Sequence, residues 1–170
     1  MSHVSETDSR KEIERLMEEY GSSLLRMSAI YLKDAFLAQD AVQETFLKAY
    51  RHLNDYRGES SEKTWLISIL INTCRDMLKT AYFRHHSRMN MDMLSETPAD
   101  FRFPDNTVIS EVMRLPAKYR EVVLLRYYEE MKIKEVSSAL KLSVGKTRSR
   151  LNKANEILRG RLEEWYDEES

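Results

Sequence analysis

The sequence predicts an all-α protein in which two small helical domains, an N-terminal helical bundle and a C-terminal helix-turn-helix, are joined by a flexible linker. Long stretches repeat apolar residues at the three- and four-residue spacing of an amphipathic helix. The alternation of a half-buried strand is absent, and the chain has only 4 glycines. All 3 prolines (Pro98, Pro104 and Pro116) fall in one short region, which indicates a break between two helical parts.

The N-terminal domain is expected to span residues 10–84 and to contain a three-helix bundle. Apolar periodicity places the helices at about 12–32, 37–53 and 63–80, with a polar loop over 54–62 before the third. The inner face of the first helix should carry Ile13, Leu16, Met17, Tyr20, Leu24, Met27 and Tyr31.

A linker is expected over residues 85–110, because the segment 87–106 lacks helical periodicity and holds two of the prolines. The C-terminal domain should span residues 111–165. Its first helix would begin near Pro116, where proline suits a first turn, and run to about Met131. Two shorter helices would follow.

The composition is that of a globular protein, with 42% hydrophobic and 32% charged residues among 170. No apolar run approaches the roughly 18 residues that cross a bilayer, and the N-terminus is too polar for a signal peptide. We therefore expect a cytoplasmic protein with no direct membrane insertion. The single cysteine, Cys74, excludes an internal disulfide and lies in an apolar helical stretch, where a buried and inert thiol is expected.

The sequence holds no recognisable catalytic or metal-binding motif. The glycine-rich phosphate loops, the GxSxG nucleophile elbow and the HExxH metal pair are all absent. The adjacent His85 and His86 would point in different directions on a helix, so they do not indicate a metal site. We expect no catalytic residue, no metal and no cofactor.

The net charge is only −1, but the charge is unevenly distributed along the chain. Lysines and arginines crowd the C-terminal third, while acidic residues gather at both ends. A local basic face on a nearly neutral chain favours DNA contact that is made alongside another partner.

The segment DAVQETFLKAY, residues 40–50, places its apolar side chains on one helical stripe that should face the core. The polar side chains that lie mostly away from this stripe are Asp40, Gln43, Glu44 and Lys48. By itself, this pattern favours a solvated polar face.

The loop 54–62 and the start of the next helix have the chemistry of a single-stranded DNA site. Aromatic faces stack on unpaired bases, small polar groups reach base edges, and cations hold phosphates. Residues of these kinds are Tyr56, Arg57, Gly58, Ser60, Ser61, Lys63 and Trp65. The alternative is a glycine-containing turn in which Ser60 or Ser61 caps the next helix and Trp65 is buried, and both interpretations can hold at once.

The segment 132–162 is typical of a helix-turn-helix, with Lys141 and Leu142 at the turn and Ser143 as a good N-cap for the second helix. When Leu151 is set at the centre of the buried face, one set of side chains points outward: Lys146, Ser149, Asn152, Lys153 and Glu156, with Arg148 on a flank. A major-groove reader requires such a face, although a charged surface helix would show the same pattern.

Several segments together resemble the extracytoplasmic-function (ECF) class of bacterial sigma factors, a part of the sigma-70 family. YLKDAFLAQDAVQETFLKAYRHL and YRGESSEKTWLISILINTCRDML resemble the second conserved region of that class. LPAKYREVVLLRYYEEM and SVGKTRSRLNKA resemble the fourth. The resemblance extends from about Tyr20 to Leu162 and implies core polymerase binding and −10 recognition for the first domain, with −35 recognition for the second.

The resemblance also implies roles for individual residues. The set expected on the clamp helices of the polymerase's largest subunit is Asp40, Gln43 and Glu44, with Lys48 beside them. The C-terminal domain would meet the flap of the second-largest subunit. An extruded −10 base would be held by Tyr56, Arg57, Ser60, Ser61 and Asn72 beside Trp65, with Lys63 and Arg75 on phosphates. The −35 bases would be read by Arg148, Ser149, Asn152 and Lys153, with Arg126, Lys146 and Arg150 on phosphates.

Three positions depart from the family pattern. Glu62 stands where an aromatic or apolar residue is frequent, Lys141 where glycine is frequent, and Asn155 where a basic residue is usual. Glu62 could change which −10 base is preferred, and Lys141 and Asn155 could change which −35 sequence is preferred.

The hypothesis is therefore a sigma factor that binds core RNA polymerase and promoter DNA, and that an anti-sigma factor masks, as is common in this class. The alternative is a stand-alone helix-turn-helix regulator with an N-terminal dimerisation or sensing domain. That alternative predicts tight promoter binding without polymerase, usually at a two-fold symmetric site. A sigma factor of nearly neutral charge should bind duplex DNA only weakly when alone.

Overall fold

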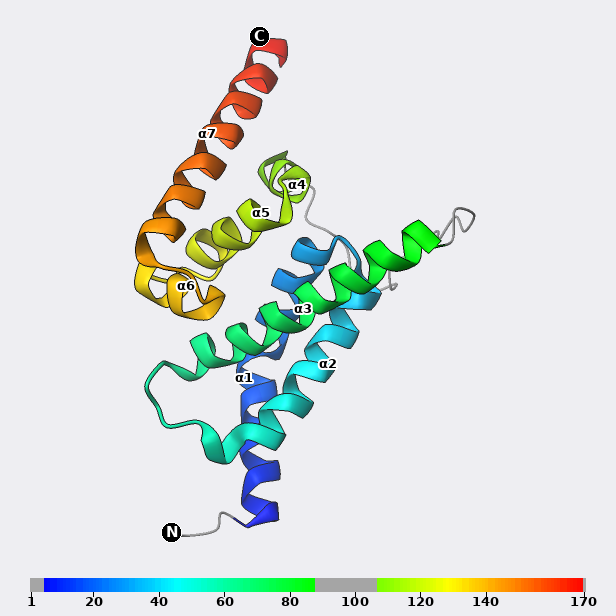
Figure 1. Cartoon of the computed structure of the whole chain (residues 1–170), viewed down its shortest axis with the longest axis vertical. Coiled ribbons are helices and arrows are strands. Elements are labelled where there is room, and N and C mark those ends of the chain that lie inside the picture. The colour runs from blue at the N-terminus through cyan, green and yellow to red at the C-terminus, as the bar shows by residue number, and fades with distance from the viewer. Residues whose placement is uncertain (1–4, 88–106, 170) are drawn as a thin grey trace. The chain divides into compact units, whose positions relative to one another are not determined.

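The computed structural model of the chain describes residues 5–87 and 107–169, all as helices and short connections (Figure 1). The predicted all-α class is confirmed. The chain divides into two compact units, Met1–Phe101 and Arg102–Ser170, and each is described here by itself. Most of the predicted linker 85–110 lies outside the described residues.

The N-terminal unit is built from three long helices, α1 (Glu6–Leu32), α2 (Ala35–His52) and α3 (Glu62–Ser87), with a 3₁₀ turn η1 (Leu53–Asp55) after α2. Side chains begin the first two helices. Ser5 Oγ accepts a hydrogen bond from the backbone N–H of Asp8 at 3.2 Å, and Asp34 Oδ1 accepts from the N–H groups of Phe36 and Leu37 at 2.9 and 3.0 Å. These caps fix where the helices begin.

The core of this unit lies between the three helices, since α3 packs against both α1 and α2 (Figure 1). Its largest fully buried side chains are Tyr31, Leu16, Leu24, Met27, Ile30, Leu66, Ile67, Leu70 and Ile71. The expectation that Met17 faces this core was wrong, because its side chain is 49% exposed. Cys74 is buried, as predicted, and burial raises the pKa of its thiol to about 12, which disfavours the reactive thiolate.

The C-terminal unit contains α4 (Thr107–Arg114), α5 (Ala117–Val123), one π turn η2 (Leu124–Tyr128), α6 (Ile133–Leu140) and α7 (Val144–Glu169). Helical structure thus begins inside the segment 85–110 that was predicted as linker, because α4 packs against α5 and α7. The helix expected to reach Met131 ends earlier. Its last part widens into the π turn, and Glu130 then takes a left-handed φ of 55°.

Buried polar groups join the helices of this unit. Arg120 is 4% exposed, and its Nη1 donates to the carbonyl oxygens of Met113 and Leu115 at 3.0 and 2.9 Å, which satisfies the end of α4. Ser137 Oγ donates to Thr147 Oγ1 at 2.8 Å and links α6 to α7. None of the described helices has the length and apolar character that crossing a membrane requires.

Candidate functional site

The outer face of α2 presents the polar residues that the sequence singled out. Asp40 and Gln43 are exposed and Glu44 is half-buried, while Phe46 and Ala49 are buried on the opposite side. The predicted division of this helix into an apolar inner stripe and a polar outer face is therefore observed.

Two apolar side chains on the same helix were missed by the sequence analysis. Phe36 is 46% exposed and Leu47 is 52% exposed. At about 100° per residue, Phe36 lies roughly 20° and Leu47 roughly 40° from Gln43 around the helix. Exposed apolar groups that flank a polar centre are typical of a protein-binding face. The sequence does contain a signal for them, because a helical wheel places both apolar residues outside the inner stripe of α2.

Lys48 is tied to the neighbouring helix. Its Nζ donates to Thr73 Oγ1 at 2.9 Å, and Thr73 Oγ1 donates in turn to the Ile69 carbonyl at 3.0 Å. Lys48 is half-buried and joins α2 to α3 as well as bordering the outer face.

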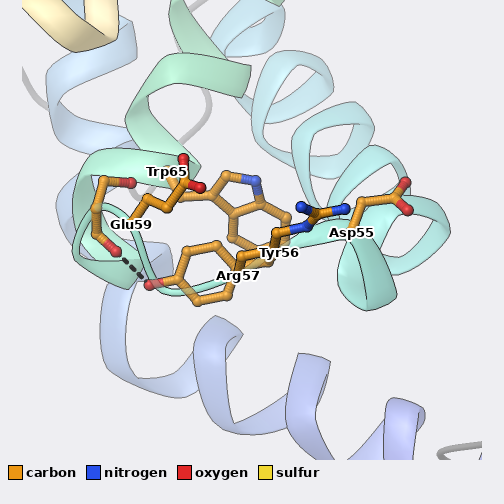
Figure 2. A pocket seen from close by; sticks show the side chains of 6 residues that line it. Asp55, Tyr56, Arg57, Glu59 and Trp65 are labelled. Carbon is orange, nitrogen blue, oxygen red and sulfur yellow. Dashed lines mark hydrogen bonds between the residues drawn. The ribbon is translucent and has the colours of Figure 1, made fainter. Parts of the chain in front are cut away.

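A surface hollow of about 360 Å³ lies between the end of α2 and the start of α3 (Figure 2). Its lining is Asp55, Tyr56, Arg57, Glu59, Ser60 and Trp65. Four of the predicted −10 residues (Tyr56, Arg57, Ser60 and Trp65) therefore come together around one hollow.

Two stacked aromatic rings, those of Tyr56 and Trp65, line the hollow. The centroids of Tyr56 and Trp65 are 4.7 Å apart, and the ring planes differ by 24°. The Tyr56 hydroxyl donates to the Ser60 carbonyl at 2.5 Å, the bond drawn in Figure 2, and so ties the two ends of the loop together. Gly58 makes the bend between them with a φ of 73°, where a side chain would be strained. Partial burial, then the nearby Glu62, raises the pKa of Tyr56, so its hydroxyl keeps the proton that it donates.

Two further contacts hold the loop where α3 begins. Ser61 Oγ accepts from the backbone N–H of Thr64 at 3.1 Å, which confirms a serine N-cap. Glu62 accepts from Arg15 Nη2 at 2.7 Å, and Arg15 also binds Glu12 on its own helix. Hydrogen bonds to Glu12 first and Glu62 second raise the pKa of Arg15. Glu62, the departure from the family pattern, thus anchors α3 to α1.

The remaining predicted −10 residues lie along α3 and do not line the hollow. Lys63, Asn72 and Arg75 are half-buried. Asn72 follows Trp65 by two turns and lies about 20° from it around the helix, so it shares the face of Trp65.

The sequence analysis missed two carboxylates that line the hollow, Asp55 and Glu59. Asp55 Oδ2 lies 3.1 Å from His52 Nδ1 at the end of α2. Nothing in the local pattern separates these acids from ordinary loop acids. Their carboxylates accept hydrogen bonds and oppose a phosphate inside the hollow.

In the C-terminal unit, α7 has the face that the helical wheel predicted. Ser143 Oγ accepts from the backbone N–H of Lys146 at 3.1 Å, which confirms the predicted N-cap. The buried side of α7 carries Thr147, Leu151, Ala154 and Leu158. The exposed side carries Lys146, Arg148, Ser149, Asn152 and Lys153.

Two predicted phosphate contacts also bind within the protein. Arg150 Nη1 lies 3.5 Å from Oε1 of Glu121, whose side chain is 3% exposed. Arg126 Nη1 donates to the Met131 carbonyl at 3.4 Å, across the end of η2. The Arg150 pair fastens α7 to α5, a role that the sequence did not indicate.

The two units match two families of known proteins. The Sigma-70 region 2 family matches residues 16–84, and the Sigma-70, region 4 family matches residues 106–156. Two solved structures share the fold at 22% identity. One is the sigma factor RpoE in complex with the anti-sigma factor NepR from Bartonella quintana, with a TM-score of 0.70 over 88% of this chain and 98% of that one. The other is CnrH in complex with the cytosolic domain of CnrY, with a TM-score of 0.68 over 93% and 92%.

Similar curated proteins are sigma factors as well. The ECF RNA polymerase sigma-E factor of Haemophilus influenzae is 30% identical over 142 residues, 73% of this chain and 74% of that protein. The RNA polymerase sigma-H factor of Pseudomonas aeruginosa is 29% identical over 164 residues, 88% and 85% of the two chains. The ECF RNA polymerase sigma factor SigW of Bacillus subtilis is 26% identical over 162 residues, 86% and 87%. The stand-alone regulator is not favoured, and the chain belongs to the ECF class of the sigma-70 family as a promoter-directing sigma factor.

Proposed function

We propose that this sigma factor binds core RNA polymerase through the outer face of α2, captures the melted −10 strand at the hollow, and binds the −35 duplex with α7. The observation that carries the proposal is the pairing of an aromatic-floored hollow with an exposed, basic helix-turn-helix. The polymerase performs the chemistry, in the cytoplasm, and this chain supplies no catalytic group.

The polymerase contact is assigned to Asp40, Gln43 and Glu44, with Lys48 at its edge. The first two side chains are exposed on a helix whose other side is buried, so they can meet a partner without unfolding the unit. We place the clamp helices of the largest subunit on this face and the flap of the second-largest subunit on the C-terminal unit.

The −10 contact is assigned to the hollow. An extruded base would stack on the ring pair of Tyr56 and Trp65, and Arg57 and the Ser60 hydroxyl would reach its edge. Asp55 and Glu59 would accept from the amino groups of a base and oppose a phosphate. Because the site accepts only an unpaired base, its binding free energy favours strand opening and offsets a few kcal/mol of lost stacking.

Lys63 and Arg75 on α3, outside the acidic hollow, are the proposed contacts to phosphates of the melted strand. Ser61 and Asn72 would lie beside this strand. On α7, the proposed base readers are Arg148, Ser149, Asn152 and Lys153, all of them exposed. The proposed phosphate contacts are Lys146, Arg126 and Arg150, and the last two keep their contacts within the protein.

An anti-sigma factor is the proposed regulatory partner. The structure of RpoE from Bartonella quintana, which shares this fold, was solved with the anti-sigma factor NepR. A partner that covered the face of α2 or α7 would block polymerase or promoter binding, because both faces are exposed in the chain as described.

Run-off transcription tests the proposal. Purified core polymerase is supplied with fragmented genomic DNA of the source organism, with and without this protein. New discrete transcripts that require the protein are expected, and aligning their start sites gives both promoter elements. No transcript, together with a footprint made by the protein alone, would contradict the proposal.

The polymerase face is tested by the double variant Gln43→Ala and Glu44→Ala. We expect weaker binding to core polymerase with an unchanged helical content, because these side chains contribute little to the core. The matched control is Glu14→Ala, an exposed acid on α1 that the proposal does not use. Holoenzyme assembly at the wild-type level would refute the assignment.

A further inference from the structure

Tyr127 and Asn155 form a polar contact between η2 and α7 to which the proposed function gives no role. Asn155 Nδ2 donates to the Tyr127 hydroxyl at 3.0 Å. The Tyr127 side chain is 52% exposed, although Leu124 and Leu125 of the same turn are buried. The guanidinium carbon of Arg126 lies 5.7 Å from the centre of the Tyr127 ring.

This geometry leaves the Tyr127 hydroxyl as a donor. A phenol has one proton to donate and lone pairs with which to accept. The bond from Asn155 occupies a lone pair, and no described residue accepts the proton of Tyr127. With the positive charge of Arg126 beside the ring, the contact suits a negatively charged acceptor.

The contact lies at the edge of the proposed DNA-binding face. Arg148, Asn152, Asn155 and Arg159 follow one another at spacings of four, three and four residues. At about 100° per residue, they form one stripe within roughly 60° on α7. In a helix-turn-helix, the N-terminal part of the recognition helix contacts base edges. The later part, where Asn155 holds Tyr127, then lies nearer the sugar-phosphate backbone.

We propose that the Tyr127 hydroxyl, held in place by Asn155, donates a hydrogen bond to a phosphate oxygen of the −35 duplex, on the strand that borders the groove read by Arg148 and Asn152. Tyr127 is the binding residue and Asn155 is a positioning residue. The inference rests on the proposed binding of the −35 element by α7. It gives Asn155 a function at a position where the family usually places a basic side chain.

The test compares Tyr127→Phe with Tyr128→Phe in holoenzyme bound to promoter duplex. Tyr128 is the matched control, because its side chain is 38% exposed and its ring follows Tyr127 in the same turn. We expect Tyr127→Phe to weaken binding by roughly three- to tenfold, as the loss of one hydrogen bond would, and equally on duplexes with different −35 base pairs. Tyr128→Phe should bind as the wild type does.

Neutral methylphosphonates placed one at a time in the −35 backbone identify the acceptor. At one position in the DNA, the methylphosphonate should weaken promoter binding by the wild-type holoenzyme. At the same position, it should cause little further loss of binding by the Tyr127→Phe holoenzyme. Asn155→Leu should weaken binding in the wild type but have no effect in the Tyr127→Phe background, because it acts through Tyr127. Rescue by Asn155→Gln, which keeps the amide donor, would support positioning by hydrogen bonding.

Several outcomes would overturn the inference. One is wild-type binding by Tyr127→Phe, and another is a loss confined to one −35 base pair, which would indicate base reading. A third is weaker assembly with core polymerase, which would assign Tyr127 to a protein contact. If wild-type holoenzyme shows no dependence on the −35 element at all, the proposed function itself fails, so the two failures are distinguishable.

Discussion

The hollow of the N-terminal unit and the exposed face of α7 are both proposed to bind DNA, yet they are built in opposite ways. Around the hollow, polar groups are engaged within the protein: the Tyr56 hydroxyl binds the Ser60 carbonyl, and Glu62 binds Arg15. On α7, by contrast, Arg148 and its exposed neighbours extend from a helix whose rigidity comes from its buried side.

The difference follows from the two forms of DNA. Duplex DNA presents a groove of fixed shape, so a rigid helix with outward side chains is sufficient to read it. A flexible single strand offers no fixed surface, and the protein itself must hold the shape that an extruded base enters. We therefore expect substitutions at the hollow to impair strand opening and substitutions on α7 to impair sequence reading.

The largest effect is expected from Trp65→Ala. It removes the ring on which Tyr56 stacks and part of the floor of the hollow. Stacking of a base on an aromatic ring contributes about 1–3 kcal/mol, so promoter opening should fall roughly tenfold or more. Permanganate reactivity of unpaired thymines in the −10 element measures opening.

Trp65→Phe is the control for that variant, because it keeps a ring and should retain most of the opening. Binding to a duplex that carries only the −35 element should be unchanged in both variants. If Trp65→Ala weakened −35 binding as much as it weakened opening, the assignment of opening to the hollow and of −35 binding to α7 would be contradicted.

Arg148→Ala should give the next largest effect, and a different kind of effect. An exposed arginine that reads base edges contributes about 1–3 kcal/mol at one or two −35 positions. Competition among duplexes with single base-pair changes should show specificity relaxed at those positions only. Lys146→Ala is the comparison variant. It should weaken binding equally on all of these duplexes and should lower the slope of log affinity against log salt concentration by about one. A uniform loss for Arg148→Ala would make it a phosphate contact instead.

The sequence predicted α7 better than the hollow, for a physical reason. Helical periodicity fixes which side chains of α7 face outward, and local capping fixes its start at Ser143, so both were confirmed. The hollow depends on contacts between distant segments. Asp55 and Glu59 line it only because the loop folds back on Trp65, and no local pattern carries that information.

Long-range pairing also explains the other structural roles that the sequence did not indicate. Lys48 and Arg150 are polar residues of ordinary helical position, and only the packing of α2 on α3 and of α7 on α5 gives them Thr73 and Glu121 as partners. The wrong placement of Met17 has the same origin. A helical wheel gives the direction of a side chain, but how far the neighbouring helices reach around α1 is set by tertiary packing.

A smaller effect, of opposite sign, is expected from Lys141→Gly. Lys141 ends α6 with a left-handed φ of 54°, a conformation that favours glycine. The substitution should stabilise the helix-turn-helix by about 1 kcal/mol, which hydrogen exchange at the amides of α6 and α7 would detect. Lys153→Gly, in the exposed middle of α7, should instead cost about 1 kcal/mol. Destabilisation by Lys141→Gly would mean that its side chain contributes more than its backbone conformation costs.

The smallest change in stability is expected from Tyr56→Phe, which keeps the ring on Trp65 and removes only the hydroxyl that binds the Ser60 carbonyl. A part-buried hydrogen bond of this kind contributes about 1 kcal/mol, because the Ser60 carbonyl can still bind water when the hydroxyl is gone. Opening should nevertheless slow by a few-fold, since a loosened loop must become ordered when the base binds. Permanganate reactivity over time measures this rate, and −35 binding serves as the internal control. Opening at the wild-type rate would show that ring stacking alone lets the hollow bind an extruded base. A rigid loop would then no longer be a difference between the hollow and the exposed face of α7.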